Sequence, residues 1–166
     1  MNRKHSSQQL QYVSFRIGDR LYGVDIHVVK EVNPSIEIAA VPLSNACYRG
    51  LVNIRGQIVL VIDTSIALGM GPTTVSEESQ LVIFKTTQEV ANLRNTNHSY
   101  NAARFGDKPV ALLVDSIGDV LSVEKSQAEQ APAHLSEKAA GFVEHVVKLK
   151  DGVLTVLDPE TILGAC

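Results

Sequence analysis

Tryptophan is absent from this sequence, and aromatic residues make up only 5% of its 166 residues. Proteins that bind single-stranded nucleic acid stack bases on aromatic side chains, and proteins that bind duplexes carry clustered Lys and Arg. Acidic residues outnumber basic ones here, and the formal net charge is −3. The composition therefore argues against a nucleic-acid-binding surface. With 45% hydrophobic and 20% charged residues it suits a folded chain of one domain, or two very small ones.

Cysteine and long apolar runs are scarce as well. Cys47 and Cys166 belong to no metal-spaced pair, and a disulfide framework needs more cysteines, so we expect two reduced thiols in a cytosolic protein. The longest apolar runs, such as residues 58–62, are far too short to span a bilayer. Residues 1–9 lack the apolar region of a signal peptide. The sequence predicts a cytoplasmic protein that reaches a membrane only through a partner.

Motifs for catalysis or metal binding are missing too. The five histidines lack metal-ligand spacing, no Gly-rich phosphate loop is present, and no Gly-x-Ser-x-Gly nucleophile turn occurs. Five aspartates, most of them after expected strands, are typical of helix caps and turns rather than of a catalytic pair: Asp25, Asp63, Asp115, Asp119 and Asp158. We therefore expect no catalytic residue, no metal and no cofactor.

The most informative stretch is residues 50–63. Alternating apolar residues lead into Arg55-Gly56, and a run of β-branched residues leads out to Asp63. This pattern predicts two strands joined by a tight turn, because Val and Ile favour a pleated surface and Gly supplies a positive φ. Arg55 is either a solvated turn residue, the commoner case, or a charged anchor at a protein interface. Glu31 is either an ordinary surface carboxylate or the partner that holds Arg55 in place.

The hydrophobic pattern of residues 11–70 recurs in residues 80–164. The offset of roughly 90 residues indicates a duplicated unit. Between the copies, residues 70–79 form a linker rich in Gly, Pro, Thr and Ser. The second copy has a plain Asp151-Gly152 turn where the first has Arg55. A folding device would be expected twice, which weakly favours an external contact for Arg55.

Each copy supplies about five short strands and one or two single-turn helices. Five strands cannot bury two faces as an open sheet, but they can close into a small barrel. The sequence therefore predicts a mainly β fold of two SH3-like five-stranded barrels packed side by side, with short helices and a third apolar interface between them. The barrels would span about residues 11–70 and 80–164, after a flexible tail at residues 1–10. An Asn-rich insertion at residues 89–106 is expected to be an exposed hairpin tip or a disordered loop.

Residues 11–164 resemble the CheW family of adaptor proteins. The resemblance is carried by three blocks: Pro42 through Gly50 and Asn53-Ile54-Arg55-Gly56 to Asp63; Asp25-Ile26 with Val29 and Glu31; and Val114-Asp115 followed by Asp119-Val120. It implies a single CheW-like domain over residues 11–166, built as two five-stranded barrels and without enzymatic activity. The insertion at residues 89–106 is longer than the family pattern.

The resemblance also implies a function and its partners. Members act as non-catalytic scaffolds in chemotaxis signal transduction, linking the cytoplasmic tip of methyl-accepting chemoreceptors to the regulatory domain of a CheA-type histidine kinase in an array. The receptor tip would lie in the groove between the barrels. No nucleic acid and no direct membrane contact are implied. The expected binding residues are those at matching positions, Val29, Glu31, Gly50 and Arg55, with Asn53 and Gly56 beside Arg55 in the same motif.

Two alternatives from other classes remain open. A small-molecule-binding double barrel would use the groove as a closed cavity with convergent polar groups, whereas an open apolar trough fits a helix. A hydrolase would need two titratable groups within hydrogen-bond reach in one pocket. For the leading interpretation, we expect Glu31 and Arg55 to form an ion pair across the edge of the first barrel.

Overall fold

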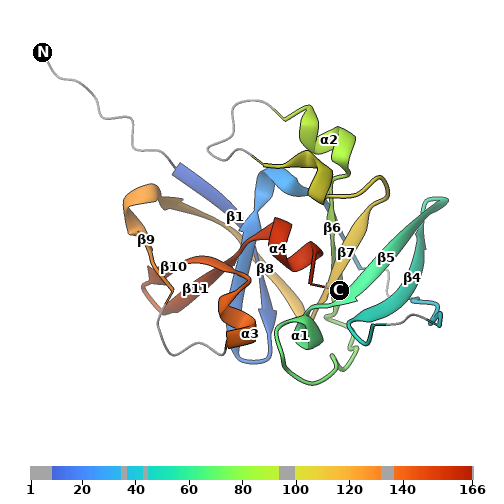
Figure 1. Ribbon diagram of the computed structural model, residues 1–166. Helices are drawn as coiled ribbons and strands as arrows, with labels where there is room; N and C mark the ends of the chain where they lie inside the picture. The colour runs from blue at the N-terminus through green and yellow to red at the C-terminus, as the bar shows by residue number, and fades with distance from the viewer. Residues whose placement is uncertain (1–8, 35–36, 43–44, 94–99, 132–136, 166) are drawn as a thin grey trace, which may run out of the picture.

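The computed structural model describes residues 9–34, 37–42, 45–93, 100–131 and 137–165 (Figure 1). Its strands are β1 (Gln9–Ile17), β2 (Arg20–Asp25), β3 (Val29–Asn33), β4 (Tyr48–Ile54), β5 (Gln57–Asp63), β6 (Gln80–Phe84), β7 (Val110–Val114), β8 (Ser116–Glu124), β9 (Ala128–Glu129), β10 (Val143–Leu149) and β11 (Gly152–Leu157). Its α-helices are α1 (Thr64–Ala67), α2 (Thr87–Ala91), α3 (Glu137–Ala140) and α4 (Pro159–Leu163), and its 3-10 helices are η1 (Ile26–Val28), η2 (Ala102–Arg104) and η3 (Lys125–Gln127). Of the tail expected at residues 1–10, residues 9 and 10 already belong to β1, and the others lie outside the described residues.

The strands form two sheets, which confirms the mainly β fold with short helices. Sheet A has the order β8-β1-β2-β11-β10-β9, and sheet B has the order β3-β6-β7-β5-β4. Neighbouring strands are antiparallel except in two places, where β2 pairs with β11 and β5 pairs with β7 in parallel. Sheet A lies at the left of Figure 1, and the β4–β5 hairpin of sheet B lies at the far right.

The two sheets do not follow the two halves of the sequence. Sheet A joins the β1–β2 hairpin to β8, β10 and β11, and sheet B joins the β6–β7 hairpin to β3, β4 and β5. The barrel bounds expected at about residues 11–70 and 80–164 are therefore wrong. Hydrophobic alternation determines which face of a strand is buried, but it does not specify which strand lies beside it. The duplication itself is visible in the strand orders. The strands β8, β1, β2, β11 and β10 of sheet A correspond in that order to β3, β6, β7, β5 and β4 of sheet B. Each sheet thus combines the first hairpin of one half of the chain with the other three strands of the other half.

Neither sheet closes into a barrel by backbone pairing among the described strands. Each strand order ends without returning to its first strand, so the closure expected from the sequence is not formed. Sheet B has the predicted five strands, whereas sheet A gains a sixth from the two-residue β9. The open side of sheet B, between β3 and the β4–β5 hairpin, is called the seam below.

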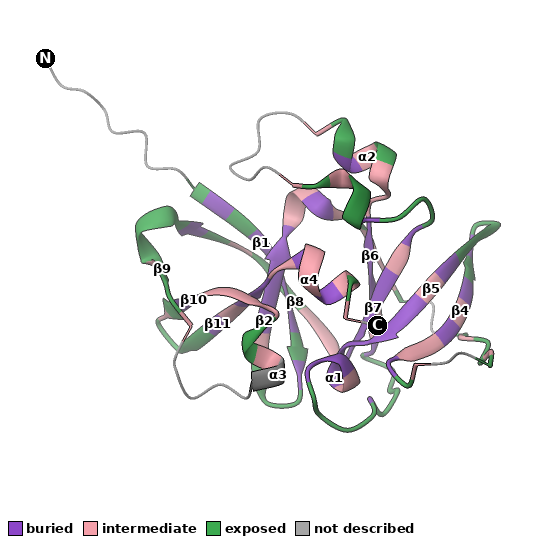
Figure 2. Ribbon diagram, in the orientation of Figure 1, coloured by how far each residue is buried: buried purple, intermediate pink, exposed green. Residues whose placement is uncertain are grey.

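The hydrophobic core has three parts, as the predicted interface between two β units requires. The core of sheet B contains Val52, Ile54, Val59, Val61, Leu81, Ile83, Ala111 and Leu113. The core of sheet A contains Leu10, Tyr12, Val123, Val147, Leu154 and Val156. The largest part lies between the sheets and includes Phe15, Val24, Ile62, Val82, Phe84, Phe105, Leu112 and Leu157. Figure 2 shows the buried strands that contribute to these cores.

Alternation along the strands explains why one sheet faces two cores. In β6, Leu81 and Ile83 belong to the core of sheet B, while Val82 and Phe84 belong to the core between the sheets. Successive side chains of a strand point to opposite faces, so a strand buried on both faces reads as a continuous apolar run. The two sheets therefore pack into one unit through a shared core.

The segment at residues 89–106, predicted to be an exposed or disordered loop, instead places several of its described side chains against the core between the sheets. Val90 in α2 and Phe105 after η2 are 5% and 2% exposed, and Leu93 and Tyr100 pack against the same core. Burying a side chain such as Val or Phe stabilises a fold by about 1.5–3 kcal/mol, so this segment contributes to folding. The sequence signal failed because the anchors are few and separated by polar residues. Residues 94–99 lie outside the described residues.

Cys47 departs from the expectation of reduced thiols. It is only 4% exposed and is joined in a disulfide. The sequence has one other cysteine, Cys166, which lies outside the described residues. A single bridge leaves no spacing pattern in the sequence, because connectivity depends on which chain segments fold together.

None of the helices in the described ranges combines the length and the apolar character needed to cross a membrane.

Candidate functional site

The β4–β5 hairpin ends in a two-residue turn of unusual composition. Ile54 pairs with Gln57, and the residues between them, Arg55 and Gly56, have φ angles of 50° and 83°. Positive φ at both central residues defines the I′ turn, whose twist matches that of the flanking strands. The side chain of Asn53 fixes the turn, because its Oδ1 accepts a hydrogen bond of 2.8 Å from the Gly56 amide. The predicted strand–turn–strand is confirmed.

Arg55 is the only non-glycine residue with positive φ in the described part of the chain. The left-handed conformation costs an L-residue on the order of 1 kcal/mol, and Asn or Gly would fit the turn with less strain. Strain of this kind is concentrated at functional sites, where the side chain matters more than the local cost. The backbone geometry thus favours the interpretation of Arg55 as an anchor over that of a passive turn residue.

Arg55 and Glu31 form the predicted ion pair. Arg55 Nη2 donates a hydrogen bond to Glu31 Oε2, across the seam between the hairpin and β3. The hydrogen bond from Arg55 is the largest cause that holds the pKa of Glu31 below its ordinary value. The Arg55 side chain remains 71% exposed, whereas that of Glu31 is 24% exposed. The carboxylate is therefore the more fixed partner, and the guanidinium still presents most of its surface to the outside.

A hollow of about 210 Å³ lies along the seam. It is lined by Lys30, Glu31, Ile54, Arg55, Gln57, Val59 and Ile83. Ile54, Val59 and Ile83 are buried members of the core of sheet B, so the hollow has an apolar floor beneath a charged rim. Such an arrangement suits a side chain of a partner protein that carries a polar end. Sequence reasoning missed Lys30 and Gln57, because neither stands out from ordinary surface residues in the sequence.

The other expected site residues lie away from this hollow. Gly50, near the opposite end of β4, has a φ of 145°, and a Cβ built there would lie 2.2 Å from the carbonyl oxygen of Ala39. Ala39 exchanges backbone hydrogen bonds of 2.7 and 2.9 Å with Leu51, so Gly50 permits this close approach. Val29 begins β3 opposite Phe84 and packs against the core between the sheets. The structure thus brings together Glu31, Asn53, Arg55 and Gly56, but not Gly50 or Val29.

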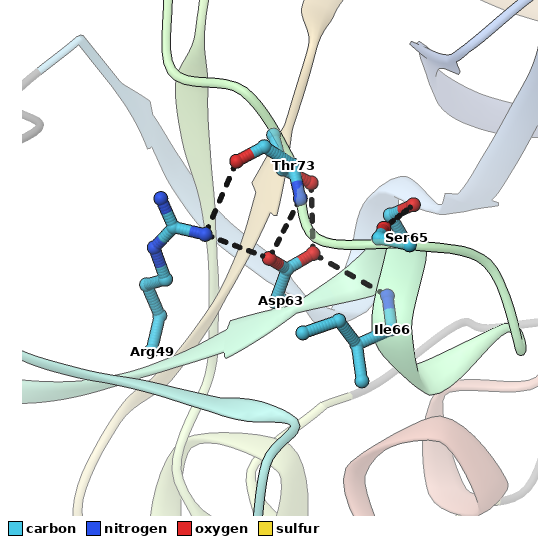
Figure 3. A network of polar contacts seen from close by, with 6 residues as sticks. Arg49, Asp63, Ser65, Ile66 and Thr73 are labelled. Carbon is cyan, nitrogen blue, oxygen red and sulfur yellow. Dashed lines mark hydrogen bonds and ion pairs between the residues drawn. The ribbon is translucent and has the colours of Figure 1, made fainter.

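A buried polar network supports the far end of the hairpin (Figure 3). Asp63 is fully buried and caps α1 by accepting from the Ile66 amide at 3.4 Å. It also accepts from the amide and the hydroxyl of Thr73, at 2.9 and 2.7 Å, and from Arg49 Nη1 at 3.1 Å. Three donors beyond the cap hold the carboxylate in place. Asp63 therefore ties the linker to β4 and β5, a role that goes beyond the helix cap expected from the sequence.

A second hollow, of about 530 Å³, lies where the linker meets the end of the β1–β2 hairpin. Its lining is mixed and includes Arg16, Gly18, Ser65, Met70, Thr74 and Asp115. It is open to solvent rather than enclosed, unlike the closed cavity that a small-molecule site would need. Within the described ranges, no group of three or more His, Cys, Asp or Glu residues is arranged to hold a metal ion.

Comparison with known proteins places this geometry in a family. Residues 11–165 match the model of the CheW-like domain. The chain is 24% identical to a probable chemotaxis protein CheW of Rhizobium etli over 93% of this chain and 87% of that protein. It is 22% identical to the chemotaxis protein CheW of Bacillus subtilis, over 91% of this chain and 85% of that one.

A solved structure shares the fold. The crystal structure of the scaffolding protein TtCheW from Thermoanaerobacter tengcongensis superposes with a TM-score of 0.73 at 23% identity, covering 93% of this chain and 92% of that chain. The match of the family model extends from β1 to the end of α4 and includes both sheets and the seam. The chain belongs to the CheW-like domain family.

Proposed function

We propose that this protein is a non-catalytic adaptor of a chemosensory array in the cytoplasm. It couples the cytoplasmic tip of methyl-accepting chemoreceptors to the regulatory domain of a CheA-type histidine kinase. Membership of the CheW-like domain family supports the role, and relatives matched over more than four fifths of their own length are chemotaxis proteins. The alternative of a small-molecule-binding barrel has no enclosed polar cavity in its favour at either hollow described above.

The observation that carries the proposal is the strained, exposed Arg55 fixed by Glu31 at the seam. Arg is enriched at protein interfaces, where its planar, permanently charged group makes directional contacts. Here the guanidinium is oriented by the pair and by the turn before any partner arrives, which reduces the entropy lost on binding. Arg55 is assigned the direct contact, Glu31 orients it, and Asn53 with Gly56 shapes the turn. Gly50 supports β4.

The receptor tip is assigned to the surface where the two sheets meet, with Val29 at its side. Val29 is only partly buried and lies at the start of β3, where the core between the sheets reaches the surface. A helical tip would lay an apolar face against such a surface. Each contact is expected to be of modest affinity, because array interfaces are small and gain strength from multivalency.

Titration calorimetry against the purified regulatory domain of the cognate kinase tests the proposal. Affinity purification of the tagged chain from its own cells identifies that kinase and the receptor beforehand. We expect saturable binding with a Kd in the micromolar range. The absence of heat and of any change in sedimentation at the highest reachable concentration, with both proteins folded, would show that the chain is not a kinase adaptor.

A further inference from the structure

The segment after β6 forms a small lobe on the η1–β3 connection. This α2–η2 lobe comprises the described residues 86–93 and 100–105, and it lies beside η1 at the top of Figure 1. It holds the connection at two points. Tyr100 donates its hydroxyl hydrogen to Asp25 Oδ2 at 2.6 Å, and Lys30 donates to Glu89 Oε1 at 3.4 Å. The residues between these points are η1 and the first residue of β3, and Glu31 follows immediately.

Asp25 links the hydrogen bond from Tyr100 to η1. It is 7% exposed, and its Oδ1 accepts the His27 amide at 3.0 Å while also lying 2.7 Å from His27 Nδ1. One carboxylate oxygen thus caps η1 and the other accepts from Tyr100. Burial raises the pKa of Tyr100, so its hydroxyl stays protonated and remains a donor. The Tyr100 ring packs edge-on against Phe105, with centroids 5.8 Å apart, so the ring and the hydroxyl make separable contributions.

Glu89 fixes the second contact. Its Oε1 accepts from the amide and the hydroxyl of Thr86, at 3.3 and 3.1 Å, in the capping box that begins α2. Burial raises the pKa of Glu89, but the hydrogen bonds from Thr86 and Lys30 outweigh it and hold the pKa below its ordinary value. The carboxylate is therefore charged and oriented by its own helix. It holds Lys30, which lines the seam hollow next to Glu31.

We propose that the α2–η2 lobe positions residues 26–31 for partner binding, with Tyr100 and Glu89 as its positioning residues. This inference rests on the proposed function, because Glu31 orients Arg55 and Val29 is assigned a contact with the receptor tip. The lobe holds the segment from both sides of η1, through one partly buried hydrogen bond and one ion pair at the edge of the hollow. The hydrogen bond from Tyr100 and the ion pair of Glu89 reach Asp25 and Lys30, not Glu31 or Arg55, so their effect passes through the backbone of η1 and β3.

Hydrogen exchange of the full chain without partners tests the positioning directly. Tyr100→Phe keeps the ring and removes the donor, and Glu89→Gln keeps a capping-box side chain while removing the charge that pairs with Lys30. We expect amide exchange in residues 26–31 to become about fivefold to tenfold faster in Tyr100→Phe, and less so in Glu89→Gln.

Two matched controls separate positioning from general loss of stability. Thr73→Val removes the buried hydrogen bond of 2.7 Å to Asp63, and Glu129→Gln removes an exposed pair with Lys148 at 3.6 Å. Neither residue contacts the lobe or the η1–β3 connection through these groups, and neither variant should accelerate exchange in residues 26–31. Unchanged exchange in Tyr100→Phe, or equal acceleration in Thr73→Val, overturns the proposal.

Calorimetry with the kinase regulatory domain supplies the functional readout. Both lobe variants should bind about fivefold to tenfold more weakly than the parent, while the two controls bind normally. Normal binding by both lobe variants overturns the role in partner binding. If the parent itself binds neither kinase domain nor receptor tip, the proposed function fails, and the exchange experiment still reports whether the lobe holds residues 26–31.

Discussion

Arg55 and Glu31 stand 24 positions apart in the sequence and on opposite sides of sheet B, yet their side chains meet. The contact crosses the seam where backbone pairing is missing, so a side-chain pair joins the outermost strand β3 to the β4–β5 hairpin. The same pair supports the apolar-floored hollow below it. A feature of sheet topology thus determines where the exposed guanidinium is presented.

Replacing Arg55 should separate binding from folding. An exposed ion pair contributes roughly 0–1 kcal/mol, so Arg55→Ala should lower the melting temperature by no more than about 3 °C. Binding to the kinase regulatory domain should fall at least tenfold, as measured by calorimetry. Lys148→Ala, which removes another exposed pair, serves as the control and should bind normally. Unfolding of Arg55→Ala would assign the residue to the fold and remove the functional argument.

Exchanging the two charges asks what Arg55 itself contributes. Glu31→Arg combined with Arg55→Glu restores a pair of opposite charges across the seam. If Arg55 touches a partner, the double variant should be as stable as the parent but remain defective in binding, and Glu31→Ala alone should show a milder defect. Full recovery of binding in the double variant would mean that the pair matters only as a structural link.

The strain at Arg55 predicts a variant that gains stability and loses function. Arg55→Gly removes the left-handed strain, worth about 1 kcal/mol, and loses an exposed pair worth no more than that. Thermal unfolding should therefore show an equal or higher melting temperature, while binding is lost as in Arg55→Ala. Arg55→Asn should behave alike, because Asn tolerates the same conformation. A clear loss of stability in both variants would show that the turn does not store strain.

Acid should break the ion pair between Glu31 and Arg55, because protonation removes the charge of the Glu31 carboxylate. The pKa of Glu31 lies below its ordinary value of 4.5, so the stabilisation from the pair is complete above pH 4.5 and disappears as the pH falls through the lower folded-state pKa. A carbon-detected NMR titration of the Glu31 carboxyl group should therefore give a midpoint below 4.5. In Arg55→Ala the midpoint should rise, because the main cause of the shift has been removed. An identical midpoint in both proteins would mean that the pair does not form in solution.

Gly50 should be needed for folding, whereas Arg55 should be needed for binding, although the family resemblance names both as binding residues. A Cβ at Gly50 meets the Ala39 carbonyl oxygen, so Gly50→Ala should destabilise the fold by about 3 kcal/mol or more in denaturant unfolding. Gly56→Ala is the matched control, because Gly56 also has a positive φ but nothing within 4 Å of its Cβ position. It should cost only about 1 kcal/mol. Equal costs in the two variants would show that the close approach at Ala39 relaxes freely.

Removing residues 90–104 should be costly. Val90, Leu93 and Tyr100 pack against the core between the sheets, and their loss exposes that core near η1. A deletion closed by a short turn should lower the free energy of unfolding by on the order of 3–5 kcal/mol, as seen by calorimetric or denaturant unfolding. A melting temperature within 2 °C of the parent, on the scale of about 1 kcal/mol, would restore the interpretation of this segment as a dispensable loop.

The sequence predicted local elements well and strand partners poorly. The Arg55-Gly56 turn, the caps at Asp63 and Asp158 and the third apolar interface all follow from local sequence patterns, and each is present. The exchanged hairpins are not local, because a strand with two buried faces carries no mark of its neighbour. Closure of the barrels was inferred from strand number alone and is not realised by the backbone.

The candidate site could be predicted only in part, because some of its features are local in the sequence and others are not. Arg55 was recognisable as a charge at a turn. Its pairing with Glu31 was expected because both match positions of the CheW family and both were placed at one edge of the first barrel. The role of Tyr100 could not be predicted. It is a lone aromatic residue in an Asn-rich segment, and no local pattern indicates its contact with Asp25, 75 positions away. The sequence predicted only a helix cap for Asp63, because its contacts with Thr73 and Arg49 depend on residues that the sequence does not place nearby.

The exchange of hairpins between the sheets constrains how such a chain arose. A single ancestral copy holding β1 to β5 alone would contain the hairpin of one sheet and three strands of the other, and could complete neither. Two copies related by a twofold axis complete both by trading hairpins, which is a domain-swapped dimer. Residues 70–79 then join the two halves into one molecule. The seam pair between Glu31 and Arg55 joins strands of the same half of the chain, whereas the corresponding turn of the other half is Asp151-Gly152.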